Sequence, residues 1–226
     1  MKPIPEIELS GETAVKETVV LVHGLWVRGW IMTLLGLQLR RCGFHTIIFS
    51  YPSMRAPLSQ NALLLSRFVA AIAAPHIHFV GHSLGGLLLL QMLAEHPEPR
   101  AGRVLLMGSP YHASYAASKL ARITLGRWLI GRSMRQWLEQ KAPACPQQHE
   151  VGSIAGCLSL GIGKLLGGLP YPNDGVVAVE ETRLPAASDH VVLNVSHTGM
   201  LFSAGVARQV CAFLRQGHFL HYPESE

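Results

Sequence analysis

The chain has 226 residues, of which 49% are apolar and 15% are charged, whereas about 25% of the residues in a typical globular domain are charged. This composition excludes an intrinsically disordered chain and a coiled coil, and the length fits a single domain over residues 1–226. The net charge is +5 and the mean hydropathy of +0.26 is high, but no run approaches the roughly 18 apolar residues that a membrane-spanning helix needs.

Short apolar runs bounded by turn residues alternate with longer helical segments along the chain. Each run is continuous, which is typical of strands that helices cover on both faces. In chain order, strands are predicted over Thr18–Val22, Thr46–Phe49, Ile77–Val80, Val104–Met107, Val151–Ala155 and Val191–Val195, and helices over Trp30–Arg41, Leu58–Ala74, Leu84–Glu95 and Met200–Gln216. The alternation predicts an α/β fold with a doubly wound, mostly parallel sheet of about six strands. Ligands of such sheets bind beyond the carboxyl ends of the strands.

The terminus and the cysteines favour a cytoplasmic protein. The first ten residues lack the basic start and apolar stretch of a secretory signal. Cys42, Cys145, Cys157 and Cys211 are scattered, with neither a CxxC pair nor a metal-ligand spacing. We therefore expect four reduced thiols.

A serine follows the third predicted strand, in the segment Gly81-His82-Ser83-Leu84-Gly85 that leads directly into a helix. The pattern G-x-S-x-G alone is weak, but a nucleophilic serine on a sharp turn requires this strand–turn–helix setting. We expect a strained backbone at Ser83, with Gly81 and Gly85 removing side chains that would collide. Ser83 is the predicted nucleophile. The alternative is a glycine-rich helix start with an incidental serine.

A serine hydroxyl needs a base, which an acid must orient. Of twelve histidines, His197 follows the last predicted strand, where this topology places a base. Asp174 is the predicted acid because it lies in a Pro-Asn-Asp-Gly turn, although a plain turn residue is the alternative. Asp189 starts the last strand, at the wrong end of the sheet, and Glu180 and Glu181 lack the turn. We interpret the remaining histidines as structural, surface or tail residues, namely His23, His45, His76, His78, His82, His96, His112, His149, His190, His218 and His221.

An oxyanion needs fixed hydrogen-bond donors. The Leu84 backbone N–H follows Ser83 at the start of the helix, and the Leu25 N–H lies in the His23-Gly24-Leu25-Trp26 turn after the first strand. These two groups are the predicted oxyanion hole. The alternative for the His23 turn is an ordinary strand-to-helix connection.

Together these segments resemble the α/β-hydrolase superfamily, in particular its compact bacterial lipase and esterase branch. HGLW, GHSLGG, NDGVV and SHTGM are similar to the oxyanion, nucleophile, acid and base segments of that branch, in the same order, over about residues 18 to 216. A fifth segment, GSPYHAS at residues 108–114, is similar to a Gly-Thr-Pro-His-x-Gly-Ser stretch of such lipases but has Tyr111 and Ala113 at the His and Gly positions. The resemblance implies the fold and a Ser83-His197-Asp174 triad, and we add Trp26 and Tyr111 as substrate-binding candidates.

The segment over about 111–150, between the fourth and fifth predicted strands, corresponds to the cap or lid of that superfamily. Residues 111–141 hold six basic residues and one acidic residue, and the rest of the chain is neutral. One face of the Ile130–Glu139 stretch is basic and polar, with Arg132, Arg135 and Gln136, and the other is apolar, with Met134, Trp137 and Leu138. Residues 119–141 can therefore contact an anionic lipid surface or cover an acyl-binding cleft. The alternative is a helix with a solvated basic face packed on the core.

The predicted function is a serine hydrolase that cleaves carboxylic esters with apolar acyl chains through an acyl-enzyme. An acyltransferase or thioesterase with the same triad and a non-catalytic lipid-binding homologue are the alternatives. No metal or organic cofactor is implied. The basic surplus has no nucleic-acid recognition motif beside it. The glycine-rich run over 161–168 lacks the spacing of a phosphate loop, and we expect an apolar loop near the site instead.

Overall fold

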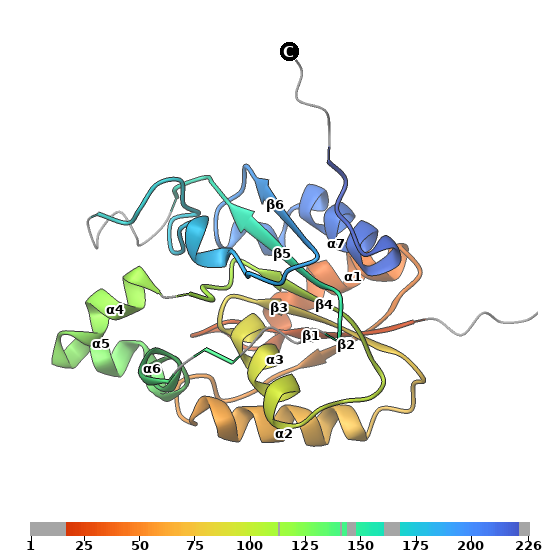
Figure 1. Cartoon of the computed structure of the whole chain (residues 1–226), viewed down its shortest axis with the longest axis horizontal. Coiled ribbons are helices and arrows are strands. Elements are labelled where there is room, and N and C mark those ends of the chain that lie inside the picture. The colour runs from red at the N-terminus through yellow and green to blue at the C-terminus, as the bar shows by residue number, and fades with distance from the viewer. Residues whose placement is uncertain (1–16, 113, 141, 144–147, 161–167, 222–226) are drawn as a thin grey trace, which may run out of the picture.

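The computed structural model describes residues 17–112, 114–140, 142–143, 148–160 and 168–221. The expected loop over 161–167, Lys141, Cys145 and the first sixteen residues lie outside these ranges. Within them, six strands form one parallel sheet in the order β2-β1-β3-β4-β5-β6 (Figure 1). The strands are β1 (Thr18–Val22), β2 (His45–Phe49), β3 (Ile77–His82), β4 (Ala101–Met107), β5 (Val151–Gly156) and β6 (Asp189–Leu193). The predicted parallel sheet is confirmed.

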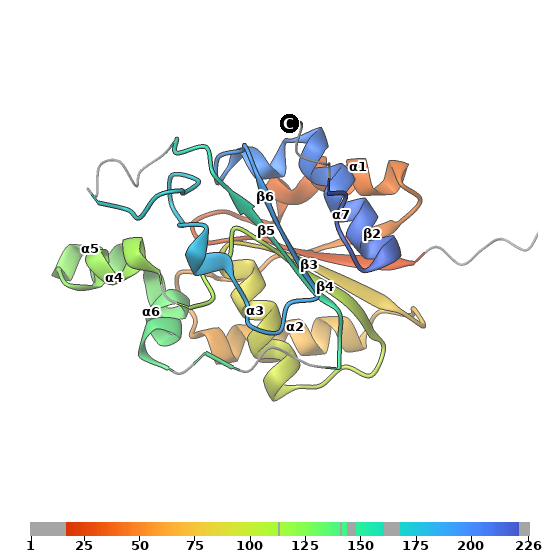
Figure 2. The same ribbon diagram turned by 45° about the horizontal axis from the view of Figure 1, so that its top comes forward.

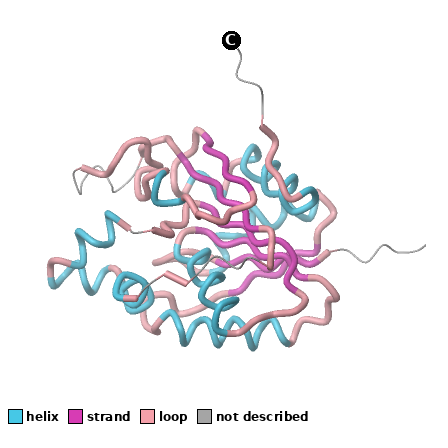
Figure 3. The backbone as a smooth tube through the Cα atoms, in the orientation of Figure 1, coloured by secondary structure: helices cyan, strands magenta, loops and turns pink. Residues whose placement is uncertain are grey.

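Helices cover both faces of this sheet. One face carries α1 (Thr33–Arg41) and α7 (Ala204–Gln216), and the other carries α2 (Leu58–Ala70) and α3 (Leu84–Glu95) (Figures 1 and 2). Short 3-10 turns precede α1 (Gly29–Met32) and α7 (Gly199–Leu201), and a third spans Glu180–Thr182. The tube in Figure 3 shows the strands enclosed between the two helical layers. None of the helices in the described ranges is both long and apolar enough to cross a membrane.

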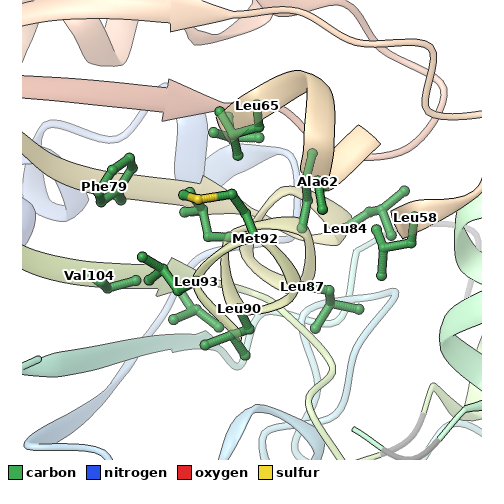
Figure 4. Close-up of a cluster of buried hydrophobic side chains, with 14 of the residues drawn as sticks. Leu58, Ala62, Leu65, Phe79, Leu84, Leu87, Leu90, Met92, Leu93 and Val104 are labelled. Carbon is green, nitrogen blue, oxygen red and sulfur yellow. The ribbon is translucent and has the colours of Figure 1, made fainter. Parts of the chain in front are cut away.

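The apolar surplus of the chain is buried in two clusters, one around α3 and the other beneath α1 and α7. Ten of the twelve residues of α3 are buried, because the helix lies on the sheet and is covered in turn by α2. Leu87, Leu90 and Leu93 of α3 pack with Phe79 of β3 and Leu65 of α2 in one cluster (Figure 4). A helix that is apolar on all sides is typical of such a doubly covered position.

Several element boundaries differ from the predictions. Strand β4 begins at Ala101 rather than Val104, and α1 and α7 begin at Thr33 and Ala204, after 3-10 turns, rather than at Trp30 and Met200. The last strand spans Asp189–Leu193 rather than Val191–Val195, because β6 is a half-exposed edge strand that pairs with β5 alone. The apolar run therefore marks only part of this strand. Helix α2 ends at Ala70 rather than Ala74, where Arg100 Nη2 donates to the Val69 carbonyl at 3.0 Å and satisfies a terminal acceptor.

Between β4 and β5, the described residues form three helices, namely α4 (Tyr115–Ala121), α5 (Thr124–Leu129) and α6 (Gly131–Glu139). The amphipathic helix predicted near Ile130–Glu139 is thus present. Its apolar face is buried in the core through Met134 and Trp137, and Ser133 donates to the Ala56 carbonyl at 2.8 Å. On the basic face of α6, Arg132 is exposed, whereas Arg135 is half-buried and Gln136 accepts from the Ser59 N–H at 3.0 Å. The helix is therefore packed on the core, with only part of its basic face in solvent.

The expectation of four reduced thiols is wrong for two of them. Cys42 after α1 and Cys211 in α7 form a disulfide across a sequence separation of 169 residues, whereas Cys157 is a free thiol. The pair joins the two helices on one face of the sheet. No spacing rule reveals such a pairing, because the fold alone brings the two residues together. The expected cytoplasmic location loses the support that reduced thiols gave it.

Replacing both Cys42 and Cys211 by alanine should lower the free energy of unfolding by about 2–4 kcal/mol, because a long loop is no longer closed in the unfolded chain. That loss corresponds to a fall in melting temperature of roughly 5–15 °C. Urea unfolding measures the effect, and Cys157→Ala, which removes a free thiol, is the matched control. Peptide mapping without reduction should recover residues 42 and 211 in one linked fragment; recovery of both as alkylated thiols would contradict the pairing.

Candidate active site

Ser83 lies on a sharp turn between β3 and α3. Its backbone has φ 55° and ψ −124°, in a region that residues other than glycine rarely occupy. The Ser83 N–H donates to the Met107 carbonyl at 2.8 Å, which ties the turn to the end of β4. The surrounding hydrogen bonds and packing thus hold the strained turn, as the sequence predicted.

Two glycines let the turn approach its neighbours closely. A Cβ on residue 81 would lie 2.5 Å from the Gly86 nitrogen, and a Cβ on residue 85 would collide with the Val22 carbonyl of β1. Real Cβ atoms do not approach backbone this closely. The predicted reason for Gly81 and Gly85 is therefore confirmed.

The structure brings His197 and Asp174 together beyond the carboxyl ends of β5 and β6. His197 Nδ1 lies 2.7 Å from Asp174 Oδ2, and both side chains are buried. Asp174 Oδ1 accepts from the backbone N–H groups of Val176 at 2.9 Å and Val177 at 2.7 Å. Because a carboxylate only accepts, Nδ1 carries the shared proton, and a neutral His197 has its Nε2 as the acceptor. That is the arrangement a general base requires.

The other acidic residues considered for this role have different partners. Glu181 accepts from the Tyr115 N–H at 2.5 Å and the Ala178 N–H at 2.7 Å, and burial raises the pKa of its carboxyl group. Glu180 pairs with Arg183 at 2.9 Å on the surface. Asp189 binds the Phe219 N–H and His221 at the opposite end of β6. These contacts leave Asp174 as the carboxylate bonded to His197.

The turn after β1 packs directly on Ser83. A Cβ on residue 24 would lie 3.0 Å from Ser83 Cβ, so a glycine here lets the two backbones meet. Leu25 and Ser83 line the same cavity, and Leu84 is the first residue of α3. The structure therefore brings both predicted oxyanion-hole segments next to the serine.

Tyr51 and the His23 ring hold that turn in place. Tyr51 Oη donates to the His23 carbonyl at 3.0 Å, and the Tyr51 N–H donates to His23 Nε2 at 3.2 Å. Since Nε2 accepts, Nδ1 carries the proton and donates to the Gly24 carbonyl at 2.8 Å. Burial also lowers the pKa of His23, which keeps the ring neutral. Tyr51 was not among the predicted site residues, although its position two residues after β2 places it at the same edge of the sheet.

His82, next to Ser83, fixes the backbone of His197. Its Nε2 donates to the His197 carbonyl at 2.9 Å, and the two ring centroids lie 4.7 Å apart. Burial, with a smaller contribution from His197, lowers the pKa of His82 to about 3, so the ring is neutral. His82 was predicted to be a structural or surface residue. It is structural, and its partner is the predicted base.

A cavity of about 250 Å³ opens onto Ser83 and His197. Most of its wall is apolar. The lining residues come from the segments after β1, β5 and β6, from α4, and from the start of α6. These apolar lining residues include Leu25, Val27, Ile31, Leu120, Ile130, Met134, Leu160, Val176, Val177 and Leu201. Such a site suits an apolar group attached to a carbonyl that Ser83 can reach.

The two substrate-binding candidates have different positions. Trp26 lines the rim of the cavity, and its side chain is about half exposed. Its backbone has a strained φ of 64°, and its Nε1 donates to the Leu129 carbonyl, at the end of α5, at 2.6 Å. Tyr111 is buried in the core beside Trp137, and its Oη donates to the Pro143 carbonyl at 3.0 Å. Of the described residues over 108–114, Pro110 and Ser114 line the cavity, and Tyr111 does not.

Comparison with known proteins places this geometry in a family context. A model described as "Alpha/beta hydrolase family" matches residues 19–221. No curated protein matches the sequence significantly.

Several solved structures are similar to the chain. The mature lipase BlEst2 of Bacillus licheniformis has a TM-score of 0.69 at 19% identity, covering 90% of this chain and 93% of its own. The metagenomic carboxyl esterase MGS0156 has a TM-score of 0.63 at 20% identity, covering 87% of this chain and 68% of its own. Carboxylesterase CesB (YbfK) of Bacillus subtilis has a TM-score of 0.55 at 14% identity, and the match covers 90% of this chain and 85% of the carboxylesterase chain. At these identities the likeness shows a shared fold.

Proposed function

Because this chain belongs to the alpha/beta hydrolase family, we propose that it is a serine hydrolase that cleaves carboxylic esters with apolar acyl chains. One observation carries the proposal: Ser83, on a strained turn, lines the same apolar cavity as His197, whose Nδ1 lies 2.7 Å from the buried Asp174 carboxylate. Structural neighbours described as a lipase and carboxyl esterases support this class of substrate.

In the proposed reaction, Ser83 Oγ attacks the ester carbonyl carbon and its proton passes to His197 Nε2. Asp174 orients the imidazole and stabilises the imidazolium that forms. The carbonyl oxygen becomes an oxyanion, which accepts from the backbone N–H groups of Leu25 and Leu84. When the carbonyl re-forms, the bond to the alcohol breaks and His197 donates the proton to the leaving oxygen.

Water completes the cycle on the acyl-enzyme. His197 takes a proton from the water as it attacks the acyl carbon, and the second tetrahedral intermediate uses the same two N–H donors. Its collapse breaks the bond to Ser83, which regains the proton, and releases the carboxylic acid. The acyl chain occupies the cavity beneath Trp26, where Leu120, Ile130 and Met134 provide apolar contacts.

We place these steps in a single domain with a cap formed by α4, α5 and α6. Residues from α4 and α6, among them Leu120 and Met134, line the cavity and support this assignment. Glu181 joins the cap to the acid segment through the Tyr115 N–H at the start of α4.

A fluorophosphonate probe should label the wild-type protein once, at Ser83. The hydroxyl bonds to phosphorus and fluoride leaves, so the adduct is stable and a peptide mass identifies the labelled residue. Ser83→Ala should remove the label. Ser109→Ala is the matched control, because Ser109 is a buried serine whose hydroxyl has no hydrogen-bond partner among the described residues. Labelling at a different residue, or full labelling of the Ser83→Ala protein, would overturn the proposal.

A further inference from the structure

Large apolar side chains point into solvent on and beside α5. Ile123 is 57% exposed, Leu125 is 67% exposed and Trp128 is 71% exposed. Leu125 and Trp128 are three residues apart in one helix, so they lie on the same side of α5. Large side chains this exposed and this close together mark an interaction site. The α5 surface, defined by these three residues, is distinct from the buried face of α6.

The charges around the α5 surface are positive. Arg122, Arg127 and Arg132 are exposed, and Arg132 Nη1 donates to the carbonyl of the exposed Arg55. Residues 111–141 contain a single acidic residue, Glu139. The three arginines and the three apolar residues are interspersed within eleven residues of the chain. A partner that binds here must therefore contact both positive charge and apolar side chains.

The α5 surface also adjoins the mouth of the cavity. Leu120 and Ile130, which flank α5 in the chain, line the cavity. The Leu129 carbonyl at the end of α5 accepts from the indole of Trp26, which is itself 51% exposed at the cavity rim. A partner on the α5 surface therefore lies beside the entrance.

We propose that the α5 surface docks this protein on an anionic lipid bilayer. Indole and leucine side chains bury themselves at the boundary between headgroups and acyl chains, and arginine binds anionic headgroups. The combination of a tryptophan, two aliphatic residues and three exposed arginines fits that boundary in both chemistry and charge. Docking there brings the cavity entrance to the membrane surface.

Vesicle sedimentation tests the docking with the full-length Ser83→Ala protein, so that no lipid is hydrolysed and the outcome does not depend on the proposed ester chemistry. The protein should sediment with vesicles of equal parts phosphatidylcholine and phosphatidylglycerol and stay in solution with phosphatidylcholine alone. Raising the ionic strength from about 0.1 M to about 1 M should release it, because the Debye length falls from about 10 Å to about 3 Å.

Two variants of the α5 surface separate charge from apolar contact. Arg122→Glu with Arg127→Glu should weaken binding about 30-fold or more, and Leu125→Ser with Trp128→Ser should weaken it at least about tenfold. Arg67→Glu and the pair Leu63→Ser with Leu64→Ser are matched controls on the exposed face of α2, and they should change binding less than about twofold. Circular dichroism checks that each variant is folded.

Three results would overturn the proposal. The first is failure of the folded protein to bind anionic vesicles, or equal binding to neutral ones. The second is an equal loss of binding in the α2 controls. The third is a dimer in sedimentation equilibrium that Leu125→Ser with Trp128→Ser dissociates, because the α5 surface would then be a contact between two copies of the chain.

Discussion

Replacing Ser83 by alanine should abolish hydrolysis of p-nitrophenyl butyrate, with kcat falling by about 10⁴-fold or more. Without the hydroxyl no acyl-enzyme can form, and the oxyanion-hole donors alone supply only a small residual rate. The fold should be unchanged, because alanine removes one buried atom and adopts the same strained turn at no greater cost than serine.

Steady-state kinetics and thermal unfolding measure the two parts of this prediction. Ser109→Ala should keep activity near the wild-type rate, since its hydroxyl has no hydrogen-bond partner among the described residues. Turnover by a folded Ser83→Ala protein at the wild-type rate would show that another group carries out the chemistry.

Asp174→Asn should lower kcat by about 10⁴-fold, because it moves the proton of the His197 ring from Nδ1 to Nε2. Asp174 Oδ1 accepts from the N–H groups of Val176 and Val177, so in the variant the amide oxygen keeps that position. The amide NH₂ group then faces His197 and donates to Nδ1, which forces the proton onto Nε2. A ring with Nε2 protonated cannot accept a proton from Ser83.

Glu181→Gln is the matched control for this variant. Glu181 is a buried carboxylate in the segment after Asp174, but its two oxygens accept hydrogen bonds from the Tyr115 and Ala178 N–H groups. The single amide oxygen of glutamine can still accept one of these two bonds. We expect its kcat to stay within about tenfold of the wild type, since it makes no bond to the base. An equal loss of activity in the two folded variants would refute the assignment of Asp174 as the acid.

The sheet could be predicted from the sequence because its central strands are buried on both faces. The run Thr18–Val22 is apolar almost throughout, and its boundaries coincide with β1. The edge strand β6 is half-exposed and mixes polar with apolar residues. The strand predicted from its apolar run was therefore two residues too far along the chain. Burial on both faces thus determines how well hydrophobic pattern alone finds a strand.

Ser83 and His197 could be selected as candidates because each comes shortly after a strand, and the carboxyl ends of parallel strands meet at one edge of the sheet. Asp174 lies far from the ends of β5 and β6 in the chain, and its Pro-Asn-Asp-Gly turn selected it instead. The residues that support these three could not be predicted. His82 acts on His197 across 115 positions and Tyr51 acts on His23 across 28, and these bonds depend on contacts that no local pattern encodes. The pairing of Cys42 with Cys211 was missed for the same reason.

The disulfide joins α1 to α7 on one face of the sheet, and neither of its cysteines lines the cavity. Cys42 lies three residues before the start of β2, whereas Ser83 and His197 follow the ends of β3 and β6. The covalent link between α1 and α7 is thus separate from the candidate active site. A substitution at the disulfide can therefore change the free energy of unfolding without replacing any side chain that lines the cavity.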